Sequence, residues 1–300
     1  MTALRIATRR SELATAQAGI VRLLLKQLGH EAVLLPVDTS GDLEAGDGKE
    51  RWVDAIVDAL RTGQADLAVH SAKDLPADDP DDLVVAAVPE REDARDVLVA
   101  ADAAFLANGL PRQGARVGTS SLRRAAQLRA AVPGVDIVDL RGNVPTRLRK
   151  VASEGAADIA VLAAAGLKRL GLEPGTVVPL EADVMVPAPG QGALAIQCRT
   201  DDRQLRAVLT SIDHRASAVT VAAERALTRA LNGDCNVPLG AHATMAGDIV
   251  HLTACVAAPD GSEVIRGSAE SEDPVHAAHT VVADLQRDGA DRILDAVRAR

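Results

Sequence analysis

Aromatic residues are almost missing from this sequence, which has one Trp, one Phe and no Tyr. Proteins that bind single-stranded nucleic acids commonly stack bases on aromatic side chains, so this scarcity argues against that class. The formal net charge of −9, from 33 basic and 42 acidic residues, argues against a general polyanion binder. We therefore expect no nucleic-acid partner, and a core built from Ala, Val, Leu and Ile.

The sequence also lacks a run of about 18 apolar residues, which a membrane-spanning helix requires. The N-terminus has no apolar segment followed by a cleavage site. Three cysteines are too few, and odd in number, for a disulfide framework. We therefore expect a cytoplasmic protein with no membrane partner.

The length of 300 residues predicts two or three domains. From residue 4 to residue 197, short apolar runs alternate with amphipathic segments, which predicts parallel sheets with helices on both faces. The chain then changes character, and short polar turns join three expected strands, which predicts a small α+β domain. The expected helices include 12–28, 120–131, 144–154 and 216–231, and the late strands are 241–245, 249–256 and 263–269.

The three cysteines differ in their surroundings. Cys198 and Cys255 lie in apolar runs and read as small buried hydrophobic residues. Cys235 lies in the polar turn 232–238, between Gly and Pro residues that indicate an irregular loop. Cys235 is therefore the accessible thiol, although an exposed loop cysteine alone does not establish a function.

Basic turns follow several of the expected strands. The segment 118–124 has small hydroxyl residues at a helix start, with Arg123 and Arg124 behind them, and the segment 141–149 follows the next strand. Helix N-termini and guanidinium forks both bind carboxylates and phosphates. For a single Arg a solvated helix face is an equally good interpretation, but two such turns after strands predict a site for a multiply anionic small molecule.

Two further turns belong to the same pattern. Lys73 and Asp74 follow the expected strand 66–69, where a carboxylate can transfer protons or stabilise a cation; an ion pair or a helix cap is the alternative. The segment 9–11 follows the first strand and is a weaker anion site of the same kind. Metal-ligand spacings and nucleotide-binding glycine patterns are absent.

Seven motifs in the same order resemble the porphobilinogen deaminase family, also called hydroxymethylbilane synthases. They include Ala-Val-His-Ser-Ala-Lys-Asp-Leu-Pro at 68–76 and Pro-Gly-Gln-Gly-Ala at 189–193; the others are 5–9, 89–93, 117–124, 140–144 and 165–171. The resemblance covers essentially the whole chain. It implies two α/β lobes similar to type 2 periplasmic binding proteins, with mixed or parallel sheets, and a small α+β C-terminal domain. The implied boundaries are 1–92 with 193–213, then 93–192, then 214–300, in a monomer.

The resemblance also implies an activity and a cofactor. Members of this family are transferases of tetrapyrrole and heme biosynthesis, and they carry a dipyrromethane joined to a loop cysteine by a thioether, here Cys235. They condense four porphobilinogen molecules head to tail, release ammonia at each step and hydrolyse off the linear tetrapyrrole hydroxymethylbilane. Each pyrrole bears an acetate and a propionate, so a cleft rich in arginine suits the growing chain.

Site residues follow from the matched motifs. The resemblance implies that Asp74 is the catalytic residue, because a carboxylate beside the pyrrole nitrogens would stabilise positive charge and move protons, whereas arginine stays protonated. The resemblance assigns to the cofactor, besides Cys235, the residues Lys73, Ser121, Arg123, Arg124, Arg141 and Gly192. It assigns to the substrate Arg9, Ser11, Arg141, Arg147 and Arg169, and to a mobile loop Lys49 and Trp52. No metal site is expected.

This sequence departs from the family pattern at two places. Asp234 and Asn236 flank Cys235, and a neighbouring carboxylate disfavours the thiolate, which predicts slower cofactor attachment. The loop 41–51 is short and acidic, with Lys49 as its only Lys, and Trp52 stands near the position of a family Phe.

Two other functions fit part of the sequence. A non-catalytic module of the periplasmic-binding-protein type that binds a small anion explains the arginines but not Cys235 or the third domain. A hydrolase that uses Cys235 with His214 or His242 leaves the arginines unexplained.

Overall fold

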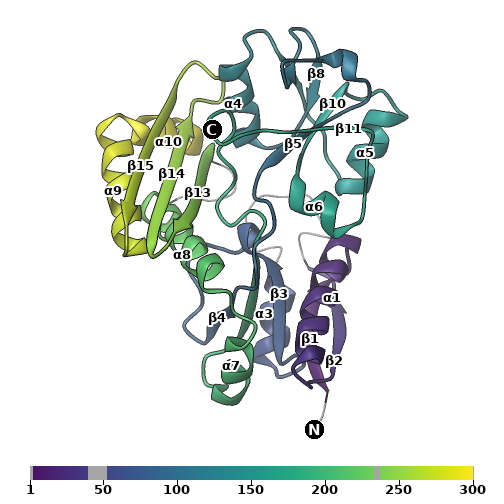
Figure 1. The fold of residues 1–300 in the computed structure, drawn as a ribbon, viewed down its shortest axis with the longest axis vertical. Helices are drawn as coiled ribbons and strands as arrows, with labels where there is room; N and C mark the ends of the chain where they lie inside the picture. The colour runs from purple at the N-terminus through teal and green to yellow at the C-terminus, as the bar shows by residue number, and fades with distance from the viewer. Residues whose placement is uncertain (1–2, 40–52, 233–236, 300) are drawn as a thin grey trace.

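The computed structural model describes residues 3–39, 53–232 and 237–299, which are arranged as Figure 1 shows. The predictions for Lys49, Trp52, Cys235 and the loop 41–51 lie outside these described residues.

The first lobe combines the N-terminal part of the chain with one later strand. Its elements are β1 (Leu4–Arg9), α1 (Glu12–Gln27), β2 (Ala32–Val37), α3 (Asp54–Arg61), β3 (Leu67–Ser71), the 3₁₀ turn η2 (Ala72–Asp74), β4 (Leu83–Ala87), β12 (Leu194–Arg199) and α7 (Arg203–Thr210). The strand order is β2-β1-β3-β12-β4. Buried side chains of α1 and α7 pack on one face of this sheet and those of α3 on the other, so helices cover both faces.

The second lobe lies above the first in Figure 1 and contains the middle of the chain. Its elements are β5 (Asp96–Ala100), η3 (Ala103–Phe105), β6 (Leu106–Ala107), β7 (Leu110–Pro111), β8 (Arg116–Gly118), α4 (Leu122–Ala131), β9 (Asp136–Val138), α5 (Val144–Ala152), β10 (Ile159–Ala163), α6 (Ala164–Arg169) and β11 (Thr176–Pro179). The main sheet has the order β11-β5-β10-β8-β9. Side chains of α4 pack on one face and those of α5 and α6 on the other.

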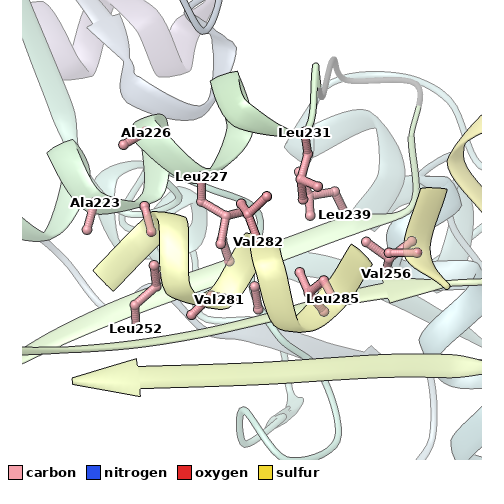
Figure 2. Close-up of a cluster of buried hydrophobic side chains, with 14 of the residues drawn as sticks. Ala223, Ala226, Leu227, Leu231, Leu239, Leu252, Val256, Val281, Val282 and Leu285 are labelled. Atoms are coloured by element: carbon pink, nitrogen blue, oxygen red, sulfur yellow. The ribbon is translucent and has the colours of Figure 1, made fainter. Parts of the chain in front are cut away.

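The C-terminal domain is the predicted α+β unit. Its elements are α8 (Arg215–Ala230), β13 (Leu239–Ala246), β14 (Ile249–Ala257), β15 (Val264–Ser271), α9 (Pro274–Arg287) and α10 (Ala290–Arg298). The three strands form an antiparallel meander in chain order. Figure 2 shows its core, which includes Leu227 of α8 together with Val281, Val282 and Leu285 of α9. The predicted fold class, two α/β lobes and a small α+β domain, is confirmed.

The two large sheets are mixed rather than wholly parallel. In each, one strand runs against its neighbours: β12 in the first lobe and β5 in the second. Each of these is the first strand after the chain crosses from one lobe to the other. Because the crossings lie at the edge where the other strands end, β5 and β12 start at that edge and run away from it.

Candidate active site

The predicted turns meet where the strands of the two lobes end. Lys73 and Asp74 lie in η2 after β3, Ser121 lies between β8 and α4, and Arg147 lies on α5. All four border a cavity of about 400 Å³ between the lobes, which we call the central cavity. Its other lining residues include Arg123, Arg124, Gln191, Val237 and Leu239.

Two smaller cavities adjoin the central cavity and share residues with it. One of about 80 Å³ shares Lys73, Arg124 and Arg147 and adds Arg169 and Gly192. The other, of about 50 Å³, shares Asp74 and adds Arg9 and Ser11. The structure thus gathers these sequence-predicted residues around one connected region.

Arg141 lies outside this region. Its side chain is 77% exposed, and its Nε donates to Asp139 Oδ2 at 2.9 Å. Because a mostly exposed side chain is free to turn, its predicted role in cofactor and substrate binding remains a prediction.

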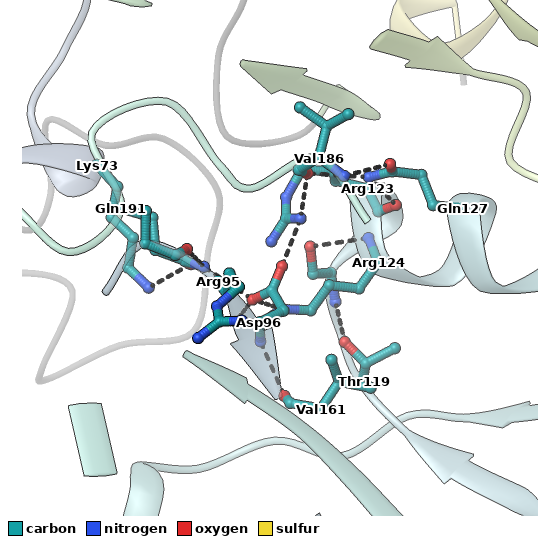
Figure 3. Close-up of polar contacts among 12 residues, drawn as sticks. Lys73, Arg95, Asp96, Thr119, Arg123, Arg124, Gln127, Val161, Val186 and Gln191 are labelled. Carbon is teal, nitrogen blue, oxygen red and sulfur yellow. Dashed lines mark hydrogen bonds and ion pairs between the residues drawn. The ribbon is translucent and has the colours of Figure 1, made fainter. Parts of the chain in front are cut away.

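Arg123 and Arg124 share a buried carboxylate that the sequence reasoning did not identify. Arg123 Nη1 donates to Asp96 Oδ2 at 2.7 Å, and Arg124 Nη2 donates to Asp96 Oδ1 at 2.7 Å (Figure 3). Asp96 is fully buried at the start of β5. Burial alone would raise the pKa of Asp96, but the two guanidinium charges hold that pKa well below its ordinary value.

At the helix start near Ser121, some of the backbone N–H donors already have acceptors, which the sequence did not suggest. Ser121 Oγ accepts a bond of 3.5 Å from the backbone N–H of Arg124, and Thr119 Oγ1 accepts one of 3.1 Å from that of Ser121. Two backbone donors of the expected anion site are therefore already satisfied. The positive charge that faces the central cavity comes mainly from side chains.

Lys73 is half-buried at the wall shared by two of the cavities. Its Nζ donates to Gln191 Oε1 at 3.3 Å. Burial lowers the pKa of Lys73 to about 8, although the neighbouring Asp74 opposes this shift. Because this pKa lies close to neutral pH, the charge of Lys73 is sensitive to the groups around it.

Asp74 stands where the central cavity meets the cavity of Arg9 and Ser11. It is half-buried, and no side chain of the described residues makes a hydrogen bond or ion pair with its carboxylate. Neither alternative for Asp74, an ion pair or a helix cap, is seen as a hydrogen bond or salt bridge among the described residues, although the Asp74 charge does favour the charged form of Lys73. Its carboxylate can act on a molecule in the cavity.

Arg147 and Arg169 carry unused donors. The Nε atom of each is buried and has no hydrogen-bond acceptor among the described residues. Burial lowers the pKa of Arg147 to about 10 and also lowers that of Arg169. Buried donors without acceptors are unfavourable unless a ligand pairs with them, and guanidinium donors fit a carboxylate.

Gly192 lies in the segment that returns from the second lobe to the first, which we call the second crossing. Its φ is +86°, and a Cβ atom there would lie 2.4 Å from the carbonyl oxygen of Glu92. Its own carbonyl oxygen accepts from Arg169 Nη2 at 2.6 Å. Glycine is therefore required for the close approach that positions Arg169.

Glu224 is a second buried carboxylate that the sequence reasoning missed. On α8, it accepts bonds from Arg91 Nη1 at 2.7 Å, from Gly190 N at 2.6 Å and from Ala243 N at 2.7 Å. It thereby joins both crossings to the C-terminal domain. The sequence did carry a signal for both buried carboxylates. Glu224 lies on the apolar face of an expected helix, and Asp96 stands at the start of an apolar strand. A carboxylate that is buried in such a position needs partners.

For the two cysteines that the structure describes, the prediction that they are buried is confirmed. Cys198 and Cys255 are buried, and burial raises the pKa of both thiols, to about 11 for Cys198. Val237, two residues after Cys235, lines the central cavity. The described end of the anchor turn 232–238 therefore lies in the wall of the central cavity.

The two histidines proposed for a hydrolase differ in their contacts. His214 caps α8, with Nδ1 2.8 Å from Ser217 Oγ. His242 Nδ1 is buried without a hydrogen-bond partner among the described residues and lies 3.7 Å from Glu224 Oε1. Within the described ranges, no group of His, Cys, Asp and Glu side chains could hold a metal ion. Among the same residues, no helix is both long and apolar enough to span a membrane.

Several solved structures of transport-related proteins share a distant likeness with this chain. The aliphatic sulphonate binding protein SsuA from Escherichia coli is 16% identical, with a TM-score of 0.40, over 77% of this chain and 70% of its own. A substrate binding domain of a putative amino acid ABC transporter from Streptococcus pneumoniae is 14% identical, with a TM-score of 0.43, over 77% and 95%. Likeness at this level carries no functional argument.

Sequence comparisons are far more specific. Residues 4–207 match the family profile of the porphobilinogen deaminase dipyromethane cofactor binding domain, and residues 218–288 match that of the porphobilinogen deaminase C-terminal domain. The porphobilinogen deaminase of Syntrophotalea carbinolica is 46% identical over 99% of this chain and 96% of its own length. That of Corynebacterium efficiens is 44% identical over 97% and 99%. With its cofactor-binding and C-terminal parts both matched over nearly full length, the chain belongs to the porphobilinogen deaminase family.

Proposed function

We propose that this chain is a porphobilinogen deaminase, a transferase that condenses four porphobilinogen molecules on a dipyrromethane held by Cys235 and releases hydroxymethylbilane. The observation that carries the proposal is the set of cationic side chains around one connected region, with two buried Nε donors that lack acceptors. Such a site suits a ligand with many carboxylates. The acetate and propionate groups of linked pyrroles supply them.

The residues present fit the dipyrromethane group. Lys73, Arg123 and Arg124 place cationic side chains at the wall of the central cavity, and carboxylates pair with such groups through charge-assisted bonds. Lys73, Ser121, Arg123, Arg124 and Gly192 would hold the cofactor, with Arg141 reaching in from the surface. When bound, dipyrromethane supplies the pyrrole carbon to which the first porphobilinogen is joined.

Substrate binding falls to the arginines nearest Asp74 and the second lobe. Arg9 and Ser11 share a cavity with Asp74, and Arg147 and Arg169 share one with Lys73. The donors in these two cavities would together fix a substrate by both its acidic side chains. Fixing both ends orients the aminomethyl group, from which ammonia leaves.

Asp74 is the residue that handles protons and positive charge. Loss of ammonia from porphobilinogen leaves a cationic, electron-poor pyrrole, which a carboxylate stabilises electrostatically. The Asp74 oxygens can also accept and return a proton, whereas the surrounding guanidinium groups cannot. Lys73 and the arginines therefore bind, and Asp74 acts on the reacting rings.

We also propose the organisation in which this chemistry takes place. The domains are residues 1–92 with 193–213, residues 93–192 and residues 214–300, a division supported by the strand that returns to the first sheet after the second crossing. The protein acts as a cytoplasmic monomer with porphobilinogen as its small-molecule partner.

The mass of the intact, denatured chain tests the proposal, with Cys235→Ser as its control. The expected result is an excess equal to two linked pyrrole units in the parent chain and a bare mass in the variant. A bare parent chain is then incubated with porphobilinogen. If its mass still fails to rise and no porphobilinogen is consumed, the non-catalytic anion-binding module replaces the proposed enzyme.

A further inference from the structure

Asp96 has an environment that the binding of a polycarboxylate does not by itself explain. It is a fully buried carboxylate, and the two arginines that pair with it line the central cavity. Arg124 contacts Asp96 Oδ1 through both Nε, at 3.0 Å, and Nη2, at 2.7 Å, and its Nη1 donates to the carbonyl of Val161 at 2.9 Å. Arg123 Nη1 divides between Asp96 Oδ2 and the carbonyl of Val186. Each guanidinium is thus held in one orientation.

A third residue extends this network to Lys73. Gln191 Nε2 donates to Asp96 Oδ1 at 2.9 Å and to the carbonyl of Ala94 at 2.7 Å, which leaves its Oε1 to accept from Lys73 Nζ (Figure 3). The amide can bond Asp96 and Lys73 together only in this orientation, because a carboxylate accepts and an ammonium donates. Asp96 therefore influences Lys73 through Gln191 as well as through space.

We propose that Asp96 is a positioning residue that fixes the two arginines toward the cavity and, through Gln191, keeps Lys73 oriented and charged. This inference rests on the proposed function and deepens it. Asp96 lines none of the three cavities that hold the site residues, so it acts through Arg123, Arg124 and Lys73.

The charges around Lys73 explain why such a residue is needed. Asp74 faces it from η2, Arg123 and Arg124 from α4, Arg147 from α5 and Arg169 from α6. Apart from Asp74, these neighbours are all cations, and Arg123 and Arg124 disfavour the charged form of Lys73. Asp96 is the second anion that stabilises that form, and it offsets the two arginines nearest to it.

The direct test is the titration of Lys73 itself, in full-length protein carrying Cys235→Ser so that no variant differs in bound cofactor. Competitive labelling with acetic anhydride at several pH values, read on the peptide that contains Lys73, gives its pKa. Asp96→Asn removes the anion and leaves both arginines, so the pKa should fall by about one unit. Glu224→Gln is the matched control: it neutralises an equally buried, arginine-paired carboxylate outside the cavities, and Lys73 should titrate as in the parent.

A second pair of variants protects the test against misfolding, since Asp96→Asn leaves buried cations unpaired. Arg123→Gln should raise the pKa of Lys73, and adding Asp96→Asn to it should lower that pKa again by about one unit. An unchanged Lys73 in both comparisons overturns the proposal, as does an equal shift in Glu224→Gln.

Turnover in the cofactor-loaded enzymes provides the functional readout. The loss of kcat/KM in Asp96→Asn, relative to the parent, should grow as the pH rises through the alkaline range, because Lys73 loses its charge at a lower pH in the variant than in the parent. A loss that is the same at all pH values indicates a merely structural role and refutes the inference. If the parent chain consumes no porphobilinogen, the proposed function fails, while the Lys73 titration still decides the role of Asp96.

Discussion

Replacing Arg147 by leucine should weaken substrate binding and stabilise the protein at the same time. Arg147 Nε is a buried donor without an acceptor among the described residues, and it borders both the central cavity and that of Arg169. A charge-assisted hydrogen bond contributes roughly 1.5–3 kcal/mol, so its loss should raise KM for porphobilinogen roughly 10- to 150-fold.

Stability should change in the opposite direction. Burial lowers the pKa of Arg147 to about 10, which means that the folded protein without ligand holds this charge unfavourably. After allowance for solvent screening of a half-buried group, Arg147→Leu should raise the free energy of unfolding by about 1–2 kcal/mol. Urea denaturation of Cys235→Ser protein, which cannot carry the cofactor, measures this term.

Arg149→Leu is the matched control, two residues further along the same helix. Arg149 is exposed and pairs with Glu154, so its loss should leave KM unchanged and stability within about 0.5 kcal/mol. The reasoning is refuted if Arg147→Leu leaves KM within about threefold of the parent, or if both variants behave alike.

Three further substitutions test other parts of the site. Asp74→Ala should retain the fold and the cofactor mass but lose nearly all porphobilinogen turnover. Near-normal turnover would contradict the assignment of Asp74 as the catalytic residue. Glu224→Gln leaves Arg91 buried with a neutral partner and should lower the free energy of unfolding by about 3 kcal/mol. Glu270→Gln, at an exposed position, should have little effect. Equal denaturation midpoints for the two variants would contradict this prediction. Burial lowers the pKa of His70 to about 4, so the unfolded chain takes up a proton on acidification before the folded protein does. Stability should therefore fall as the pH drops from about 6.5 towards 4, by about 2 kcal/mol at pH 5, and His70→Gln should remove this dependence in denaturation curves.

Much of the site could be predicted from the sequence because it depends on local order along the chain. Lys73, Ser121 and Arg147 each follow a short apolar strand, and the ends of parallel strands lie at one edge of a sheet. The buried Cys198 and Cys255 could be recognised for a similar reason, since neighbouring apolar residues predict burial.

Other features depend on contacts between residues far apart in the sequence. The sequence could not show that Asp96 meets Arg123 and Arg124, or that Glu224 joins Arg91, because those partners lie on other elements. It did not predict the reversed strands β5 and β12 either, since their direction follows from where the chain crosses between lobes. Nor did it separate Arg141, which is exposed, from Arg147, which lies in the cavity wall.

The sequence by itself therefore determined which chemical groups this protein has and which strand ends carry them. Only the tertiary structure decided which charges are buried, which of them neutralise one another and which are left to a ligand. The physical reason is that the charge state and free donors of a side chain depend on desolvation and on partners brought close in space, whatever their distance along the chain.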